Sequence, residues 1–283
     1  DVVYNHTTTS GQDPRSVLDR IVPGYYHRLD AAGAVTRSTC CENTATEHAM
    51  MERLMRDSVA LWARDYAIDS FRFDLMGHQP KAAMLAVQRA ADAAAGRRID
   101  LLGEGWNFGE VADGARFVQA AQRELAGSGI ATFSDRARDA WRGGGCCDSG
   151  RALLDARGVL NATGAITADL RNRADLARLG LAGTLARVDA RLPDGTVREL
   201  GGLEYAGARA GYARDPVDVV NYVENHDNPT LWDINALRLP AGTPPEERAR
   251  VQLLGAAFTV LSQGIAYFHA CIEVLRSTSL DRN

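Results

Sequence analysis

The chain has 283 residues, of which 46% are hydrophobic and 24% are charged, and its formal net charge at pH 7 is −4. This composition is that of an ordinary globular protein, and it excludes a disordered chain of low hydrophobicity and high charge. The mild acidity argues against a nucleic-acid-binding surface, which is normally basic. No run reaches the roughly 20 apolar residues that a membrane-spanning helix needs.

Apolar periodicity predicts short strands that alternate with longer helices. In chain order, we expect strands at 2–4, 68–73, 99–102, 130–133, 219–223 and 266–269, and helices at 44–67, 81–95, 115–125 and 245–261, with an Ala-rich helical region up to 183. The segment Thr44-Ala45-Thr46-Glu47 resembles a capping box at the start of the first helix. Strand–helix–strand units of this size form right-handed crossovers, so the order predicts an α/β fold with a parallel sheet.

The chain has five cysteines, which are Cys40, Cys41, Cys146, Cys147 and Cys271. Four of them form two sequence-adjacent pairs, and adjacent cysteines almost never close on each other, so we expect no disulfide within a pair. Neither pair has the C-x-x-C spacing of a zinc site or a redox motif, and the histidines lack zinc-site spacing as well. We therefore assign no metal ligands and expect structural or incidental roles for the cysteines.

Polar and charged side chains follow four of the predicted strands. They are Asn5 and His6, then Arg72 and Asp74, then Glu104, and finally His226 and Asp227. In a parallel α/β barrel the carboxyl ends of all strands point to one face, so these side chains would converge on one cleft. A single Arg-x-Asp pair is most often only a salt bridge, but four clusters at successive strand ends are a more specific signal. Carboxylates without a serine or cysteine nucleophile favour glycoside hydrolysis.

The segments around these residues resemble the four ordered signature regions of the α-amylase superfamily. They are Asp-Val-Val-Tyr-Asn-His at 1–6, Phe-Arg-Phe-Asp at 71–74, Gly-Glu-Gly-Trp at 103–106 and Tyr-Val-Glu-Asn-His-Asp-Asn at 222–228. Further segments at 38–48, 74–78, 130–135 and 228–233 resemble pullulanase-type starch-debranching enzymes. The resemblance covers essentially the whole chain.

The resemblance implies a role for each carboxylate. Asp74 would be the nucleophile that forms a glycosyl-enzyme intermediate, and Glu104 the general acid and then base. Asp227 would bind sugar hydroxyls and stabilise the transition state. Glu104 then needs a raised pKa, so that it is protonated when the substrate arrives.

Five further positions are expected to bind substrate, namely Asn5, His6, Arg72, Trp106 and His226. Arg72 lies two residues before Asp74, hence on the same face of the strand, and would keep the nucleophile ionised and oriented. His6 and His226 would donate hydrogen bonds to one sugar ring. Asn5 would brace the site, and Trp106 is a candidate for stacking on a sugar. Asp1, the first residue of its motif, is expected to be structural.

The implied function is that of a retaining endo-hydrolase of α-1,6-glucosidic linkages in pullulan, amylopectin or limit dextrins. Two alternatives stay open: a hydrolase or transferase of the same superfamily that acts on α-1,4 linkages, and a non-catalytic glucan-binding protein. The chemistry requires no cofactor. A structural calcium ion is a further expectation from the superfamily, without ligands that can be assigned here. The expected partner is a branched α-glucan, and the full-length protein is expected to be a monomer that is secreted or at the cell surface.

The resemblance also predicts a TIM-type (β/α)8 barrel that is incomplete in this chain. Residues 1–283 would form a partial catalytic domain without the first two strands, the C-terminal end and the flanking β-domains. A parallel barrel that lacks strands has open edges and cannot close its core. We therefore expect the chain by itself to be inactive or poorly folded.

Overall fold

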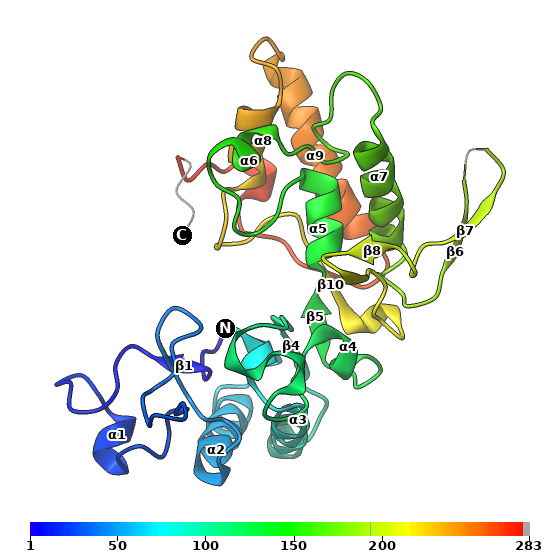
Figure 1. The fold of residues 1–283 in the computed structure, drawn as a ribbon. Coiled ribbons are helices and arrows are strands. Elements are labelled where there is room, and N and C mark those ends of the chain that lie inside the picture. The colour runs from blue at the N-terminus through cyan, green and yellow to red at the C-terminus, as the bar shows by residue number, and fades with distance from the viewer. Residues whose placement is uncertain (193, 280–283) are drawn as a thin grey trace. The chain divides into compact units, whose positions relative to one another are not determined.

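The computed structural model describes residues 1–192 and 194–279. The chain divides into two compact units, at 1–132 and 133–283 (Figure 1). The assignment of residues 1–283 to a single partial catalytic domain stays a prediction. No helix in the described part of the chain is long and apolar enough to cross a membrane.

The first unit is built on parallel strands. β3 (Ser70–Phe73) pairs with β4 (Asp100–Gly103), and β4 pairs with β5 (Ala131–Phe133). In this register Phe73 lies opposite Gly103, and Val2 forms a parallel bridge to Phe73. The carboxyl ends of β3 and β4 are therefore level with each other, next to the first residues of the chain.

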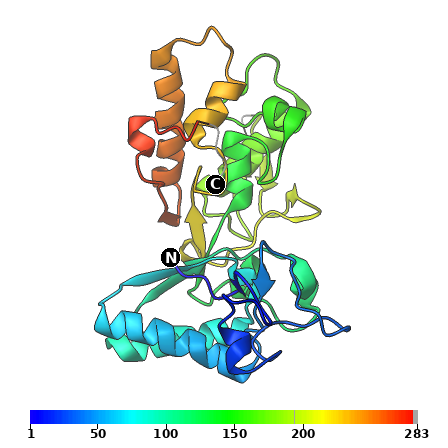
Figure 2. The same cartoon turned by 90° about the vertical axis from the view of Figure 1, so that its left-hand side faces the viewer.

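Two long helices lie side by side in the first unit, α2 (Ala49–Asp65) and α3 (Lys81–Ala95), as Figures 1 and 2 show. The prediction of a helix at 81–95 is confirmed; this Ala-rich segment follows Pro80 and ends at Gly96, which has the left-handed conformation common after helices. The core of the unit consists of apolar side chains from these helices and strands, including Met55, Val59, Phe71, Phe73, Met84, Val87 and Leu101.

The predicted capping box at 44–47 is wrong. Helix α2 begins at Ala49 after His48, and His48 makes no side-chain cap hydrogen bond. Glu47 instead binds the buried guanidinium of Arg28, with distances of 3.0 and 2.8 Å to its Nε and Nη2 atoms. A charged hydrogen bond across the fold thus replaces the local cap.

Short elements complete the first unit. They are β1 (His6–Thr7), α1 (Leu18–Ile21), β2 (Glu42–Asn43), the 3-10 helices η1 (Met76–His78) and η2 (Gly109–Gly114), and α4 (Gln122–Leu125). β1 and β2 are antiparallel, with His6 opposite Asn43. The helix predicted at 115–125 is present only as α4.

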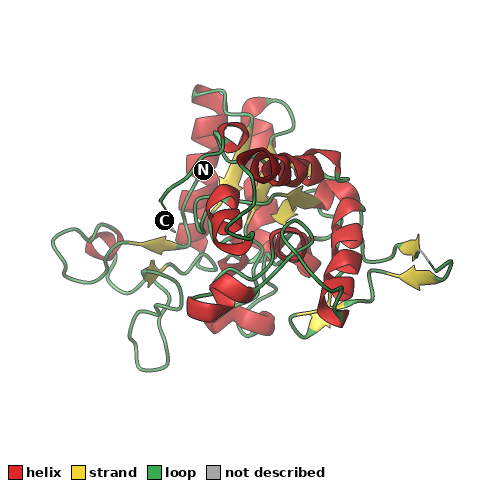
Figure 3. Cartoon of the chain, turned by 90° about the horizontal axis from the view of Figure 1, so that it is seen from above, coloured by secondary structure: helices red, strands yellow, loops and turns green. Residues whose placement is uncertain are grey.

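The second unit contains several helices and short strands; Figure 3 distinguishes the helices, strands and loops of the chain by colour. Its helices are α5 (Asp135–Arg142), α6 (Gly150–Asp155), α7 (Ala168–Leu181), α8 (Leu231–Arg238) and α9 (Pro245–Leu261), with 3-10 helices η3 (Pro216–Asp218) and η4 (Ile272–Val274). The prediction of a helix at 245–261 is confirmed. In the core of the second unit, Trp141 and Phe258 stack with ring centroids 5.4 Å apart.

Parallel and antiparallel strand pairs occur in the second unit. β10 (Val219–Asn221) and β11 (Ile265–Ala266) are parallel, with Val220 opposite Ile265. β6 (Asp189–Arg191) and β7 (Val197–Glu199) form an antiparallel hairpin, as do β8 (Glu204–Tyr205) and β9 (Ala208–Arg209).

The prediction of a TIM-type (β/α)8 barrel that lacks its first two strands is wrong. Among the described residues, parallel pairs occur at β3–β4, β4–β5 and β10–β11, and these few strands do not make up a (β/α)8 barrel that lacks only its first two strands. An alternation of strands and helices predicts parallel pairing, which is present. It does not predict how many strands join one sheet, and the assignment to a barrel depends on the number, tilt and stagger of all the strands.

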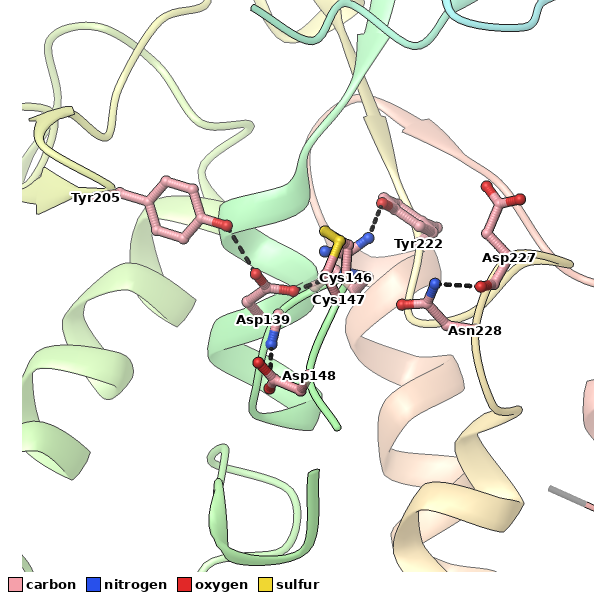
Figure 4. Close-up of a disulfide and its surroundings, with 10 residues drawn as sticks. Asp139, Cys146, Cys147, Asp148, Tyr205, Tyr222, Asp227 and Asn228 are labelled. Atoms are coloured by element: carbon pink, nitrogen blue, oxygen red, sulfur yellow. Dashed lines mark hydrogen bonds and ion pairs between the residues drawn. A yellow bond between two sulfur atoms is a disulfide. The ribbon is translucent and has the colours of Figure 1, made fainter. Parts of the chain in front are cut away.

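The expectation that adjacent cysteines stay unbonded is also wrong at one pair. Cys146 and Cys147 are joined by a disulfide in the loop that follows α5 (Figure 4). Gly143 and Gly144 both have positive φ, and the backbone N–H of Gly145 donates to Asp148 at 2.8 Å. This tight turn confines the two side chains. Cys40, Cys41 and Cys271 are free thiols.

Candidate active site

The candidate site of the first unit is centred on the guanidinium of Arg72. Its Nη1 lies 3.1 Å from a carboxylate oxygen of Asp74 and 3.1 Å from one of Asp1, and its Nη2 lies 2.6 Å from Oε1 of Glu104. Arg72 and Glu104 are buried, whereas the carboxylate of Asp1 is half exposed. One planar cation therefore joins three carboxylates, which is the geometry that a guanidinium fork provides.

The strand register explains this cluster. Arg72 and Asp74 are two residues apart, so both side chains lie on one face of the strand and its extension. Glu104 directly follows Gly103, the partner of Phe73 in the β3–β4 pair. The backbone N–H of Val2 donates to Arg72 and that of Asp74 donates to Val2, at 2.9 and 3.0 Å, which brings Asp1 to the same place.

Glu104 is held by more than Arg72. Its Oε2 accepts a hydrogen bond from the backbone N–H of Leu75 at 2.8 Å, and its carbonyl accepts one from Gly77 at 2.8 Å. Leu75 adopts the left-handed conformation, with φ of 41°. The contacts with Arg72 and Leu75 both stabilise the ionised carboxylate, whereas a general acid must be protonated. The raised pKa expected for Glu104 stays a prediction.

The lack of a side chain at Gly77 allows the backbone of Trp106 to pack closely beside the Arg72 cluster. A Cβ atom at Gly77 would lie 2.0 Å from the carbonyl oxygen of Trp106, a distance that no side chain tolerates. Trp106 itself is half-buried. The proposed sugar-stacking residue thus follows Glu104 on a backbone segment that is packed directly against η1.

His6 and Asn5 contact each other beside the nucleophile candidate Asp74, whose charge acts on His6. Asn5 is fully buried, and its Nδ2 lies 2.8 Å from Nδ1 of His6. Burial lowers the pKa of the His6 imidazole, and the negative charge of Asp74 partly opposes this effect. His6 is therefore close enough to Asp74 for the two to interact.

Sequence reasoning missed a buried charge network beside the site. Arg28 binds Glu47 and also Glu110, the latter at 2.8 Å. Burial alone would raise the pKa of Glu110, but hydrogen bonds from Arg28 and Ser38 lower it to about 2. No motif could have revealed these partners, because they lie far apart in the sequence.

His78 is a second buried group that the sequence did not single out. It is 1% exposed, and its ring lies edge-on to Phe108 with centroids 4.9 Å apart. Burial lowers the pKa of His78 to about 4. It is therefore neutral in the folded protein at neutral pH.

Sequence reasoning also missed a group of side chains that could hold a metal ion. The ligand atoms of His6, Cys40 and Cys41 all lie within 4.8 Å of one another, and within the described ranges no other such group of three is found. Spacing could not reveal it, because His6 lies 34 residues before Cys40. Calcium ligands cannot be assigned from this group, and calcium stays a prediction.

In the second unit the structure pairs His226 with Asp227. Nε2 of His226 lies 3.2 Å from Oδ1 of Asp227, and both side chains are about half exposed in the loop after β10. The N–H of Asp227 donates to Asn225 at 3.0 Å, and Asn228 donates to its carbonyl at 2.5 Å (Figure 4). His226 also lines a cavity of about 150 Å³ together with Asn225 and His269.

The candidate residues thus form one cluster in each unit. Asp74, Glu104, Arg72, Asn5 and His6 lie in the first, and His226 and Asp227 in the second. Convergence of all of them on a single cleft stays a prediction.

Comparison with known proteins tests the resemblance. No family model matches the chain. It is 45% identical over 293 residues to pullulanase of Klebsiella aerogenes and 41% identical over 304 residues to chloroplastic pullulanase 1 of Arabidopsis thaliana, and both alignments cover the whole chain. The crystal structure of Klebsiella pneumoniae pullulanase complexed with maltotriose matches 99% of the chain with a TM-score of 0.93 at 45% identity. The chain is related to a segment of the pullulanases.

The predicted resemblance to pullulanase-type enzymes is thereby confirmed. The chain spans 26% of the Klebsiella aerogenes pullulanase, 31% of the Arabidopsis pullulanase and 27% of the Klebsiella pneumoniae crystal structure. A crystal structure of a pullulanase mutant from Paenibacillus barengoltzii with maltotriose is a more distant match, with a TM-score of 0.77 at 32% identity.

Proposed function

We propose that the chain carries catalytic carboxylates of a retaining endo-hydrolase that cleaves α-1,6-glucosidic linkages in pullulan, amylopectin or limit dextrins. The observation that carries the proposal is the bridge from Arg72 to both Asp74 and Glu104. Two carboxylates bound by one guanidinium must lie close together. A retaining mechanism needs such closeness, about 5 to 5.5 Å between the carboxyl groups, whereas an inverting one needs room for a water molecule.

In this proposal Asp74 attacks the anomeric carbon and forms the glycosyl-enzyme intermediate. Arg72 is a positioning residue that keeps Asp74 ionised and aims its carboxylate. Glu104 donates a proton to the leaving glycosidic oxygen and then takes a proton from the water that releases the intermediate.

Glu104 must hold a proton for its first step. Its burial disfavours the charged form, whereas Arg72 and the N–H of Leu75 favour it. We infer that substrate binding loosens the Arg72–Glu104 contact, so that burial then dominates and the carboxyl takes up its proton. Arg72 remains with Asp74, where the negative charge is needed.

The remaining candidates would bind the sugar. Asp227 is proposed to bind hydroxyls and stabilise the transition state, with His6 and His226 as hydrogen-bond donors to the ring. Asn5 braces His6, and Trp106 offers an aromatic face. A glucan ligand is supported by the maltotriose found in crystal structures of the related pullulanases.

The test uses the protein that contains this chain, incubated with pullulan. Release of maltotriose supports cleavage at α-1,6 linkages, whereas panose would indicate α-1,4 cleavage. Proton NMR at early times reads the anomer of the new reducing end. The α anomer is expected for retention, and initial release of the β anomer would contradict the double displacement.

A further inference from the structure

The loop before β2 brings two free thiols to the imidazole of His6. Cys40 is exposed and Cys41 half-buried, and neither is in a disulfide. Nε2 of His6 lies 3.4 Å from Sγ of Cys40, and the ligand atoms of all three residues fall within 4.8 Å of one another. We propose that His6, Cys40 and Cys41 form a binding site for a thiophilic divalent cation of the zinc type, and that an ion bound there inhibits the enzyme.

The distances suit such an ion. Zinc binds thiolate sulfur at about 2.3 Å and imidazole nitrogen at about 2.0 to 2.1 Å, so neighbouring ligand atoms of a tetrahedral site lie roughly 3.5 to 4 Å apart. The His6–Cys40 distance already falls near this range. Two sulfurs and one nitrogen favour zinc, cadmium or cobalt over calcium or magnesium, which prefer oxygen. Three protein ligands leave one position for water or another group.

Asn5 is placed to orient the imidazole for this purpose. Its amide faces Nδ1 of His6, and its Oδ1 is buried without a hydrogen-bond partner. A half-turn of the amide would let that oxygen accept a hydrogen bond from Nδ1–H. The lone pair on Nε2 would then face Cys40, as in metal sites where an outer partner fixes the histidine tautomer.

The surrounding charge also favours a cation. The negative charge of Asp74 lies within electrostatic range of the Cys40 thiol, and this charge attracts a divalent cation to the group. An incoming divalent ion displaces the thiol protons, and its charge is balanced by the two thiolates and attracted by Asp74.

The inhibitory effect rests on the proposed function. There His6 donates a hydrogen bond from its ring to the sugar, beside the nucleophile Asp74. An imidazole whose Nε2 binds a metal ion cannot donate from that atom. Occupancy of the site should therefore lower turnover of glucan.

Binding is tested with cobalt(II) added to the protein that contains this chain, under a non-thiol reductant. The proposal predicts one equivalent of bound cobalt, with a thiolate-to-cobalt charge-transfer band. The double variant C40S/C41S should lose the band and bind at least ~100-fold more weakly. C41S alone should keep about half of the band, because the amplitude follows the number of thiolates.

C271S is the control: it removes the free thiol of the second unit and should leave both the band and the affinity for cobalt unchanged. Unaltered binding by the double variant, or loss of the band in C271S, would overturn the site.

Inhibition is tested in the protein that contains this chain, with zinc and with pullulan as substrate. Wild type and C271S should lose turnover as zinc fills the site, while C40S/C41S keeps its basal activity in the presence of zinc. Equal inhibition of all three overturns the inhibitory effect. If the untreated protein shows no turnover, the proposed function fails, and the cobalt spectrum still decides the metal site.

Discussion

Nη2 of Arg72 lies 2.6 Å from Oε1 of Glu104, closer than Nη1 of the same guanidinium lies to Asp74, at 3.1 Å. The sequence predicted only the second contact, because Arg72 and Asp74 are two residues apart on one strand. The first contact therefore gives Arg72 a second role in the proposed mechanism, in which it favours the ionised form of Glu104 as well as orienting Asp74.

Replacement of Arg72 by lysine tests whether its positive charge alone is sufficient or whether the planar guanidinium is needed. A single ammonium keeps the positive charge but cannot bridge two carboxylates as a planar fork does. We expect kcat on pullulan to fall by about 100-fold. The upper limb of the pH profile of kcat/KM, which reports the free enzyme in which Arg72 contacts Glu104, should move to higher pH, because the ionised form of Glu104 loses its strongest partner.

The matched control for this variant is Arg53→Lys on α2. Arg53 also pairs with a carboxylate, that of Asp57, but its side chain is mostly exposed. Its replacement should leave both kcat and the pH profile unchanged. If R72K lowers activity without any shift of the profile, Arg72 does not set the protonation of Glu104.

Gly77→Ala should disturb the site through the backbone. The new methyl group would lie 2.0 Å from the carbonyl oxygen of Trp106, so the segment that carries Glu104 and Trp106 must move. We expect a loss of stability of about 3 kcal/mol and a fall in activity. At Gly242 a Cβ atom meets nothing within 4 Å, so Gly242→Ala should unfold with an unchanged urea midpoint. Equal midpoints for the two variants would contradict the steric argument.

Acid should weaken the first unit through His78. The folded-state pKa is about 4, below the ordinary value of 6.5. The unfolded chain therefore takes up a proton at His78 as the pH falls below about 6.5, whereas the folded chain resists until about 4, and stability is lost in this window. Between pH 7 and pH 4.5 the loss should be about 2 kcal/mol.

Hydrogen exchange of the α3 and β3 amides at both pH values measures this loss locally, after correction for intrinsic rates. His78→Phe removes the titrating group and keeps a ring against Phe108. Between the same two pH values, the free energy of protection from exchange should fall in both proteins. The fall in the variant should be about 2 kcal/mol smaller than that in the wild type. The same fall in both proteins would show that His78 does not cause the acid sensitivity.

The sequence allowed accurate prediction where local signals were strong. The helices at 81–95 and 245–261 have favourable composition and clear boundaries, and both were predicted correctly. The helix start at Thr44 was wrong because Glu47 pairs with Arg28, a residue that local pattern could not connect to it. The assignment to a (β/α)8 barrel was wrong because periodicity predicts the pairing of strands but not how many strands join.

Part of the candidate site could also be predicted from the sequence. Strand-end position placed Arg72, Asp74 and Glu104 together, because neighbouring parallel strands end at one edge. Asp1 was expected to be structural, and the structure adds its contact with Arg72. The His6, Cys40 and Cys41 group could not be predicted from spacing, because the chain between these residues folds back through the β1–β2 pair.

The most direct test of the catalytic assignment is the rate of pullulan hydrolysis by D74N and E104Q in the protein that contains this chain. Each change removes one carboxylate and keeps its shape, and Asp100→Asn, an exposed carboxylate at the start of β4, is the control. Both site variants should lose at least ~1000-fold in kcat while still binding maltotriose, and the control should match the wild type. Turnover by D74N or E104Q within about tenfold of the wild type would contradict the assignment.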